Sequence, residues 1–155
     1  KQYGSMDIRL DDGTNLTVAP NASLVIDEYV FAGPSRPGSL AMSLSRGAMR
    51  MISGRMPKDG YAVTTPVATI GVRGTTLWLD AANPEQLRVW TEEGVVVARP
   101  AQSDVEFIFE APAFAVCTVT ECTEGAVPPV PETYPVDPTG LKVGDPGESE
   151  DSSSF

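Results

Sequence analysis

The chain of 155 residues contains no histidine and only two cysteines. Without histidine it lacks the side chain that most often exchanges protons near neutral pH, and no nucleophile stands beside a base. Glu92 and Glu93 are adjacent, but neighbouring side chains of a strand point to opposite faces, which argues against a glycosidase pair. Two cysteines alone are too few for a four-ligand zinc site. We therefore expect no catalytic residue, no metal and no cofactor.

The chain also lacks a run of about 18 apolar residues, the length that a membrane-spanning helix needs. Basic residues are scarce, because 11 Lys and Arg stand against 21 Asp and Glu, for a formal net charge of −10. They are scattered singly, whereas phosphate groups are bound by clusters of Lys and Arg. We expect no membrane span and no nucleic-acid partner, and we attribute the acidity to solubility.

Helical periodicity is absent over any useful length, and β-branched residues dominate the central residues 61–79. Pro66 splits this run, since it has no amide hydrogen for a strand ladder. Alternating apolar positions continue on both sides of it, separated by turn residues. The pattern predicts an all-β fold, a two-layer β-sandwich or solenoid-like roll of short antiparallel strands. The expected strands are residues 7–10, 15–18, 23–31, 39–45, 48–52, 61–65, 67–73, 75–80, 87–91, 95–98, 105–109 and 114–119.

Four glycines mark the expected turns and irregularities of these strands. Gly13 follows two aspartates in a hairpin signal, and Gly94 follows Glu92 and Glu93 in a second hairpin signal. Gly71 and Gly74 lie inside the central run, where we expect a side chain to be crowded or strained. In residues 23–31 we expect Leu24, Ile26 and Val30 on one face and Tyr29 on the other.

The two cysteines, Cys117 and Cys122, lie in the short segment CTVTEC. A close pair without other metal ligands favours a disulfide over two free thiols, and a disulfide requires an oxidising compartment. The first residue, Lys1, is not a methionine, which we take as a sign of a processed or shortened chain. We therefore expect an extracytoplasmic protein, either periplasmic, on the cell surface or secreted.

Two tryptophans, Trp78 and Trp90, lie at matching places in two expected strands. If these strands are neighbours, the two rings share an outer face that offers a platform to a sugar, together with Tyr61, or to an aromatic partner. The alternative is that one or both rings cover a second layer of the fold. Both interpretations stay open on the sequence.

From Val127 to the end the composition changes, with six prolines, six acidic residues and one lysine. Such a segment cannot bury enough apolar surface to fold by itself. We expect a domain at residues 6–122 and an extended proline-rich acidic tail at residues 123–155. The tail either docks on another protein chain, with Tyr134 and Phe155 as contacts, or acts as a solvated spacer.

The most specific motif is TPVATIGVRGT at residues 65–75, followed by an aromatic-aliphatic strand. The strand-glycine-strand unit VWTEEGVVV follows at residues 89–97. DIRLDDGTNLTVAPNASLVI at residues 7–26 and SLSRGAMRMISG at residues 43–54 precede them in matching order. Together, over about residues 6–98, these pieces resemble the FecR domain, the extracytoplasmic β domain of iron-dicitrate-sensor regulators and of many stand-alone envelope proteins.

The resemblance implies a role in binding and transmission and brings no catalytic motif. Our first hypothesis is a bacterial, non-catalytic assembly module of the cell envelope that contacts copies of itself as a homo-oligomer or polymer. The alternative is the sensor domain of a FecR-type transmembrane regulator. We place it second because we find no cytoplasmic segment with a membrane span and no C-terminal receptor-binding domain. Carbohydrate binding is a third hypothesis.

Overall fold

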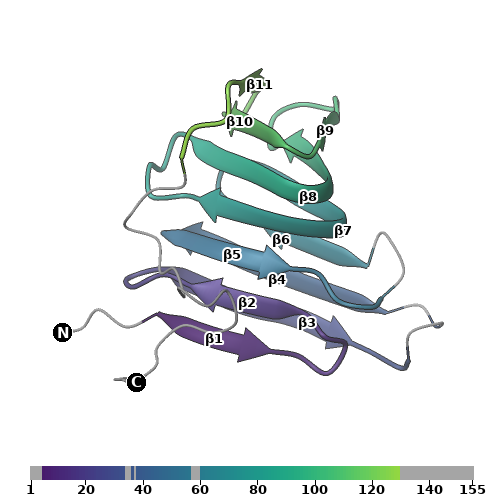
Figure 1. Cartoon of the computed structure of the whole chain (residues 1–155). Coiled ribbons are helices and arrows are strands. Elements are labelled where there is room, and N and C mark those ends of the chain that lie inside the picture. The colour runs from purple at the N-terminus through teal and green to yellow at the C-terminus, as the bar shows by residue number, and fades with distance from the viewer. Residues whose placement is uncertain (1–4, 34–35, 37, 57–59, 130–155) are drawn as a thin grey trace.

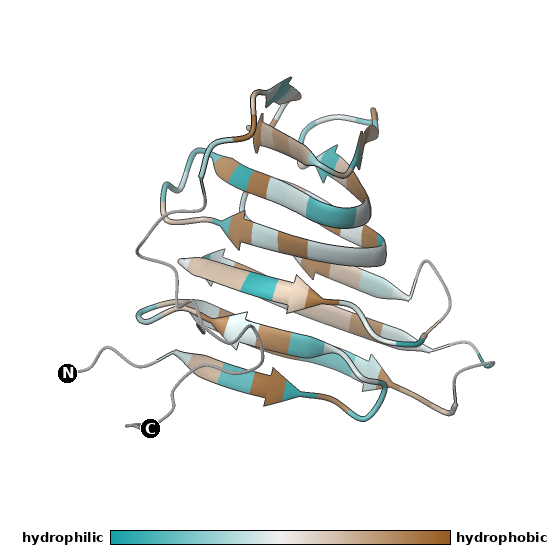
Figure 2. Cartoon of the chain, in the orientation of Figure 1, coloured by the Kyte–Doolittle hydropathy of each residue, from teal (hydrophilic) through white to brown (hydrophobic). Residues whose placement is uncertain are grey.

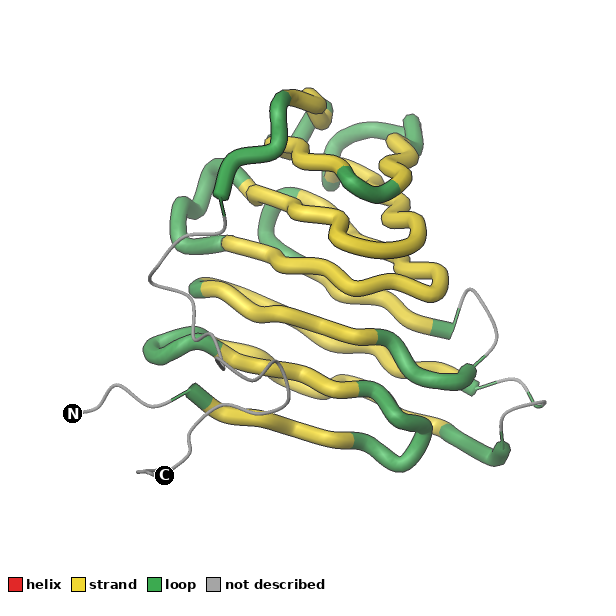
Figure 3. Tube along the Cα trace, in the orientation of Figure 1, coloured by secondary structure: helices red, strands yellow, loops and turns green. Residues whose placement is uncertain are grey.

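The computed structural model describes residues 5–33, 36, 38–56 and 60–129 of the chain. Within these residues every strand belongs to one sheet, and the rest of the described chain is loop and turn (Figures 1 and 3). The strands are β1 (Met6–Arg9), β2 (Asn15–Val18), β3 (Ser23–Val30), β4 (Ser39–Arg46), β5 (Ala48–Ile52), β6 (Tyr61–Thr64), β7 (Ala68–Asp80), β8 (Leu87–Pro100), β9 (Phe107–Glu110), β10 (Ala113–Cys117) and β11 (Cys122–Gly125).

The sheet folds over on itself because two long strands, β7 and β8, run through both of its layers. The front layer holds β1, β2, β5, the second half of β7, the first half of β8, β10 and β11. The back layer holds β3, β4, β6, the first half of β7, the second half of β8 and β9. Figure 1 shows the result, a roll that is open at the β1 end. The all-β, roll-like architecture predicted from the sequence is confirmed.

The core lies between the two layers and is built from the inward positions of alternating strands. Figure 2 shows this alternation along the ribbons. Leu40, Met42 and Leu44 of β4 are all buried, as their spacing predicts. From the front layer Met49 and Met51 are fully buried, so these methionines fill the core.

Two glycines form the corner at which β7 and β8 pass from one layer to the other. Gly74 and Gly94 have positive φ angles of 56° and 77°, which side chains disfavour. A Cβ on Gly94 would lie only 2.1 Å from the carbonyl oxygen of Gly74. Thr75 joins the corner, because its hydroxyl donates to the carbonyl oxygen of Val95 over 2.7 Å.

Several local predictions from the sequence are wrong, for one shared reason. Residues 92–94 do not form a hairpin turn, and β7 and β8 each continue as single strands, because both bend together at a register shift and are paired on both sides of it. Gly71 is not crowded, since a Cβ there would meet no atom closer than 3.9 Å. β4 and β6 pair in parallel, not antiparallel. Each difference arises from how strands pair across the sheet, which local sequence does not encode.

Strand β3 also differs from the predicted pattern of faces. Its pairing with β4 shifts by one residue between Ile26 and Glu28, which marks a β-bulge. A bulge reverses the side to which the following residues point. Tyr29 therefore packs toward the core, with Leu24, whereas Val30 is exposed.

A buried carboxylate connects the two layers at the β1 end of the roll. Asp12, in the turn between β1 and β2, is fully buried. Its Oδ2 accepts a 2.6 Å hydrogen bond from the Tyr61 hydroxyl of β6 and a 2.8 Å bond from the Thr14 hydroxyl. The Tyr29 hydroxyl of β3 accepts from the Asp12 amide at 2.9 Å. Through its carboxylate and its amide, Asp12 thus joins a front-layer turn to two back-layer strands.

Burial raises the pKa of Asp12, but hydrogen bonds from Tyr61, Thr14 and Tyr29 outweigh it and bring the net pKa below its ordinary value. Gly54 makes room for this arrangement, since a Cβ there would lie 2.5 Å from the Asp12 carbonyl oxygen.

Replacing Gly94 by alanine is expected to lower the free energy of unfolding by about 2 kcal/mol or more, because strain at positive φ adds to the clash with Gly74. Gly71→Ala is the matched control in β7 and is expected to change the stability by less than about 0.5 kcal/mol. Urea unfolding of both variants measures the difference. Equal stability losses would show that the corner does not require glycine.

Replacing Asp12 by asparagine is expected to cost about 1–3 kcal/mol at pH 7, because it removes charge-assisted hydrogen bonds in a buried place. Since the folded pKa is lowered, the Asp12 contribution is complete above the unfolded pKa of about 3.9 and is lost as the pH falls through the folded pKa. The stability gap between wild type and variant, measured by urea unfolding from pH 7 to pH 2, should therefore narrow below about pH 4. A gap that stays constant with pH would contradict this origin.

Candidate functional site: two outer faces of the roll

Aromatic rings line the outer side of the front layer. Trp78 of β7 and Trp90 of β8 are direct partners in the strand register, and Phe114 of β10 is the next partner in the same row. The rings of Trp90 and Phe114 lie 4.9 Å apart at an angle of 56°. These three residues define the aromatic face, which small side chains of Ala19, Ala22 and Ala48 complete. It is a second apolar cluster, separate from the core between the layers.

Two arginines stack on this aromatic face. The guanidinium of Arg50 lies 5.6 Å from the Trp78 ring centre, and that of Arg88 lies 5.4 Å from the Trp90 ring centre. Arg50 also pairs with Glu92 at 3.3 Å, and Arg88 pairs with Asp80 at 2.5 Å. Both cations are thus held beside the rings by a carboxylate.

The indole nitrogens of the aromatic face are hydrogen bonded. Nε1 of Trp78 donates to the Glu92 carboxylate. Nε1 of Trp90 donates to the backbone carbonyl of Pro128 over 3.1 Å. The second contact brings the chain after β11 back onto the front layer.

The sugar platform proposed from the sequence is not present in this form. Trp78 and Trp90 do share a face, but only 4% and 2% of their surfaces are exposed, so they are covered rings and not an open platform. Tyr61 is also buried, and its hydroxyl points to Asp12 in the core. Burial and the hydrogen bond to Asp12 raise the pKa of Tyr61, which keeps the phenol neutral. The three rings therefore do not form one sugar site.

The outer side of the back layer carries a hollow of about 440 Å³. Its floor follows one row of the register, in which Ala62 of β6, Gly71 of β7 and Val97 of β8 are successive partners. The same row continues to Ala41 of β4 on one side and to Ile108 of β9, which is 62% exposed, on the other. The floor is low because the central residues of the row have small side chains or none.

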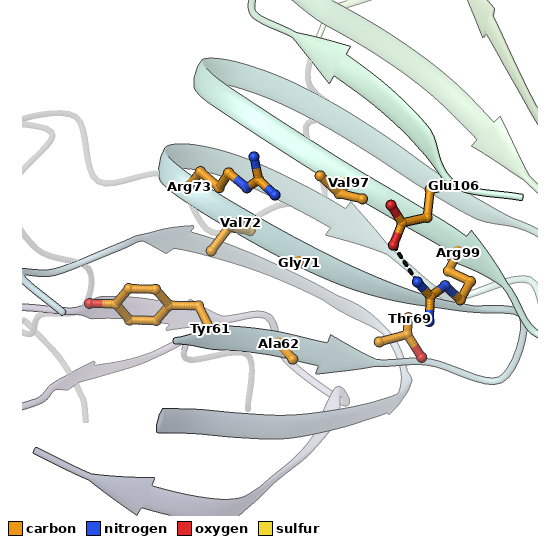
Figure 4. A pocket seen from close by; sticks show the side chains of 9 residues that line it. All are labelled: Tyr61, Ala62, Thr69, Gly71, Val72, Arg73, Val97, Arg99 and Glu106. Atoms are coloured by element: carbon orange, nitrogen blue, oxygen red, sulfur yellow. Dashed lines mark hydrogen bonds and ion pairs between the residues drawn. The ribbon is translucent and has the colours of Figure 1, made fainter. Parts of the chain in front are cut away.

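Charged side chains flank this back hollow. Arg73, Arg99 and Glu106 line it, and Arg99 and Glu106 form an ion pair (Figure 4). A low apolar floor beside charges of both signs suits an extended peptide. Gly71 thus lies at the surface of the hollow and not in a turn.

The cysteines are bonded as predicted, with 2.07 Å between the sulfurs of Cys117 and Cys122. They are register partners at the ends of β10 and β11, so the bond closes this hairpin. Tyr134 and Phe155, the other predicted partner contacts, lie outside the described residues.

Other site types find no support in the described part of the chain. Its His, Cys, Asp and Glu side chains form no group of three or more placed to hold a metal ion. The same residues contain no helix long and apolar enough to cross a membrane.

Sequence reasoning missed several residues of these sites. Arg50 and Arg88 are outward positions of alternating strands, so their side was predictable. Arg88 stacks on Trp90 of its own strand, whereas the stacking of Arg50 on Trp78 of the neighbouring strand depends on register. A contact of Pro128 with an aromatic ring was predictable in kind, since proline-rich segments often pack on aromatic rings. Its place against Trp90 follows only from the structure.

Comparison with known proteins supports the fold and places it in a family. The model of the family described as FecR protein matches residues 1–97. A comparison with curated proteins gives no match. Two crystal structures of a candidate anti-sigma factor from Parabacteroides distasonis resemble the chain with a TM-score of 0.58 each, at 19% and 18% identity.

These similarities cover 80% of this chain but only 57% and 56% of the two anti-sigma-factor chains. The chain therefore corresponds to a part of those proteins, and at this level of identity the likeness shows a shared fold. The family match spans more than half of the chain and includes the motif at residues 65–75. The chain belongs to the FecR protein family.

Proposed function

We propose that this chain is the extracytoplasmic domain of a FecR-type regulator, a non-catalytic module that acts by binding another protein. The observation that carries the proposal is the family match over residues 1–97. The likeness to a candidate anti-sigma factor supports it, because both proteins share the rolled sheet. The regulator function therefore replaces assembly as our first hypothesis.

Assembly into oligomers or polymers has less support. It rested on the proline-rich segment docking on another copy, and the described start of that segment, at Pro128, contacts Trp90 of its own chain. Carbohydrate binding is not retained, since the tryptophans are covered and Tyr61 lies apart from them.

We assign the partner contact to the back hollow between Ala62 and Val97. Its row of small and apolar residues ends in the exposed Ile108, and exposed apolar residues beside charges are typical of protein contacts. Arg73, Arg99 and Glu106 place charges of both signs beside the hollow. The back hollow thus combines apolar area with charged side chains that can fix the orientation of a bound partner.

The regulator function predicts a transcriptional effect. Deleting the coding region in the source organism should change the transcript levels of one coherent set of genes that depend on a single sigma factor, measured by RNA sequencing. Reintroducing the wild-type gene should restore them. Ala62→Arg, which fills the back hollow, should fail to restore them, whereas Thr123→Arg, on an exposed position of β11, should succeed. Unchanged transcripts after deletion would refute the regulator function.

An extracytoplasmic location is supported by the bond between Cys117 and Cys122, since such bonds persist in oxidising compartments. Protein isolated from its own cells under acid quenching and denatured should take up no thiol label before reduction and two labels after it, as read by intact mass. Two labels before reduction would contradict both the bond in the cell and the location.

A further inference from the structure

The two tryptophans of the aromatic face are nearly fully buried, although they lie on the outer side of a single sheet layer. Arg50 and Arg88 of the same layer cover part of these rings, and a further part of the chain also packs on them. Pro128 is a described contact of this kind, since its carbonyl accepts the Trp90 indole hydrogen. The aromatic face therefore already holds the start of a proline-rich segment.

The chemistry of the face suits such a segment. A proline-rich chain is extended, has free carbonyl groups as acceptors, and loses little conformational entropy when it binds. Proteins that recognise such chains use aromatic rings as a floor and an indole N–H or hydroxyl as a donor to a carbonyl. Trp78, Trp90 and Phe114 supply the rings, and Trp90 supplies the donor.

Charge adds a second match. The segment after Ala126 carries six acidic residues and one lysine. Arg50 and Arg88 on the face are each paired with a carboxylate, but the Arg88 side chain is 44% exposed and so accessible to a second one. Opposite charges around a contact favour encounter and fix orientation. A proline-rich segment without acidic residues would lack this electrostatic attraction.

The geometry of β11 favours the chain's own segment over that of a second copy. β11 ends at Gly125, which is the register partner of Phe114, and Phe114 is the partner of Trp90. The chain thus leaves the sheet directly beside the aromatic face and reaches it by Pro128. A short tether of this kind gives an effective concentration in the millimolar range, which a separate molecule rarely reaches.

We propose that the aromatic face is a docking surface for the chain's own proline-rich acidic segment, residues 127–155, which is held from Pro128 onward by the rings and by Arg50 and Arg88. The proposal is independent of the regulator function. It means that any outside protein using this face must displace the segment or imitate its proline-rich acidic chemistry.

Trp78 and Trp90 are the two tryptophans of the chain, so intrinsic fluorescence reports on this face directly. We compare the full chain with a chain ending at Ala126, after circular dichroism has shown that both are folded. The shortened chain should emit at longer wavelength and be quenched more strongly by acrylamide. A synthetic peptide of residues 127–155, added at about millimolar concentration to match the lost tether, should reverse both changes. A peptide of the same residues in scrambled order is the control.

Two arginines of β8 provide matched variants for the peptide titration. Arg88→Gln, on the aromatic face, should weaken peptide binding about two- to fivefold, the range of an exposed ion pair. Arg99→Gln, on the opposite side of the roll and also paired with a carboxylate, should leave it unchanged. Equal effects of the two substitutions on peptide binding would refute the contribution of Arg88 to the docking surface.

If the shortened chain does not fold, Trp90→Phe in the full chain tests the same contact. It keeps an aromatic ring but removes the donor to Pro128, so acrylamide quenching of Trp78 should increase. Identical quenching in the variant, or in a folded shortened chain, overturns the proposal. Light scattering provides the last test, because a full chain whose tryptophans are protected only as a dimer would make a second copy the occupant and refute docking within one chain.

Discussion

The corner between Gly74 and Gly94 is the constraint on which the rest of the structure depends. At this place two paired strands bend together, with a register shift on each side of Thr76, and resume their pairing beyond the bend, which turns one continuous sheet into two layers. Inward residues of β7 and β8 then meet inward residues of the same sheet across the core. The two layers share their central strands and so cannot slide past each other.

The end of the roll at β1 lacks such shared strands and is closed by polar contacts. Asp12 lies in a short turn, yet its partners Tyr29 and Tyr61 come from two strands of the other layer. A buried carboxylate is tolerated there because several donors surround it. Gly54 permits the close approach of this turn. The continuous strands β7 and β8 connect the two layers in the middle of the roll, whereas the hydrogen bonds of Asp12 connect them at the β1 end.

Sequence analysis located the strands well because alternation directly reflects burial, as at Leu40, Met42 and Leu44. It failed at residues 92–94, since Glu-Glu-Gly suits a tight hairpin and a bent strand equally well. Trp78 and Trp90 were placed on the correct common face, but alternation does not tell which segment covers a face. Asp12 had the local signature of a turn residue, and its partners lie far away in sequence. Properties set by neighbours within a strand were thus predictable, and properties set by pairing between distant strands were not.

The bent strands also determine how the two outer faces relate to each other. Gly71 of the back hollow and Trp78 of the aromatic face are seven residues apart in β7, and Val97 and Trp90 are seven residues apart in β8. Both faces therefore stand on the same pair of backbones, on either side of one corner. A ligand that changes the angle of this corner changes the tilt of both faces at once. The two faces are thus connected by two continuous strands that bend at Gly74 and Gly94.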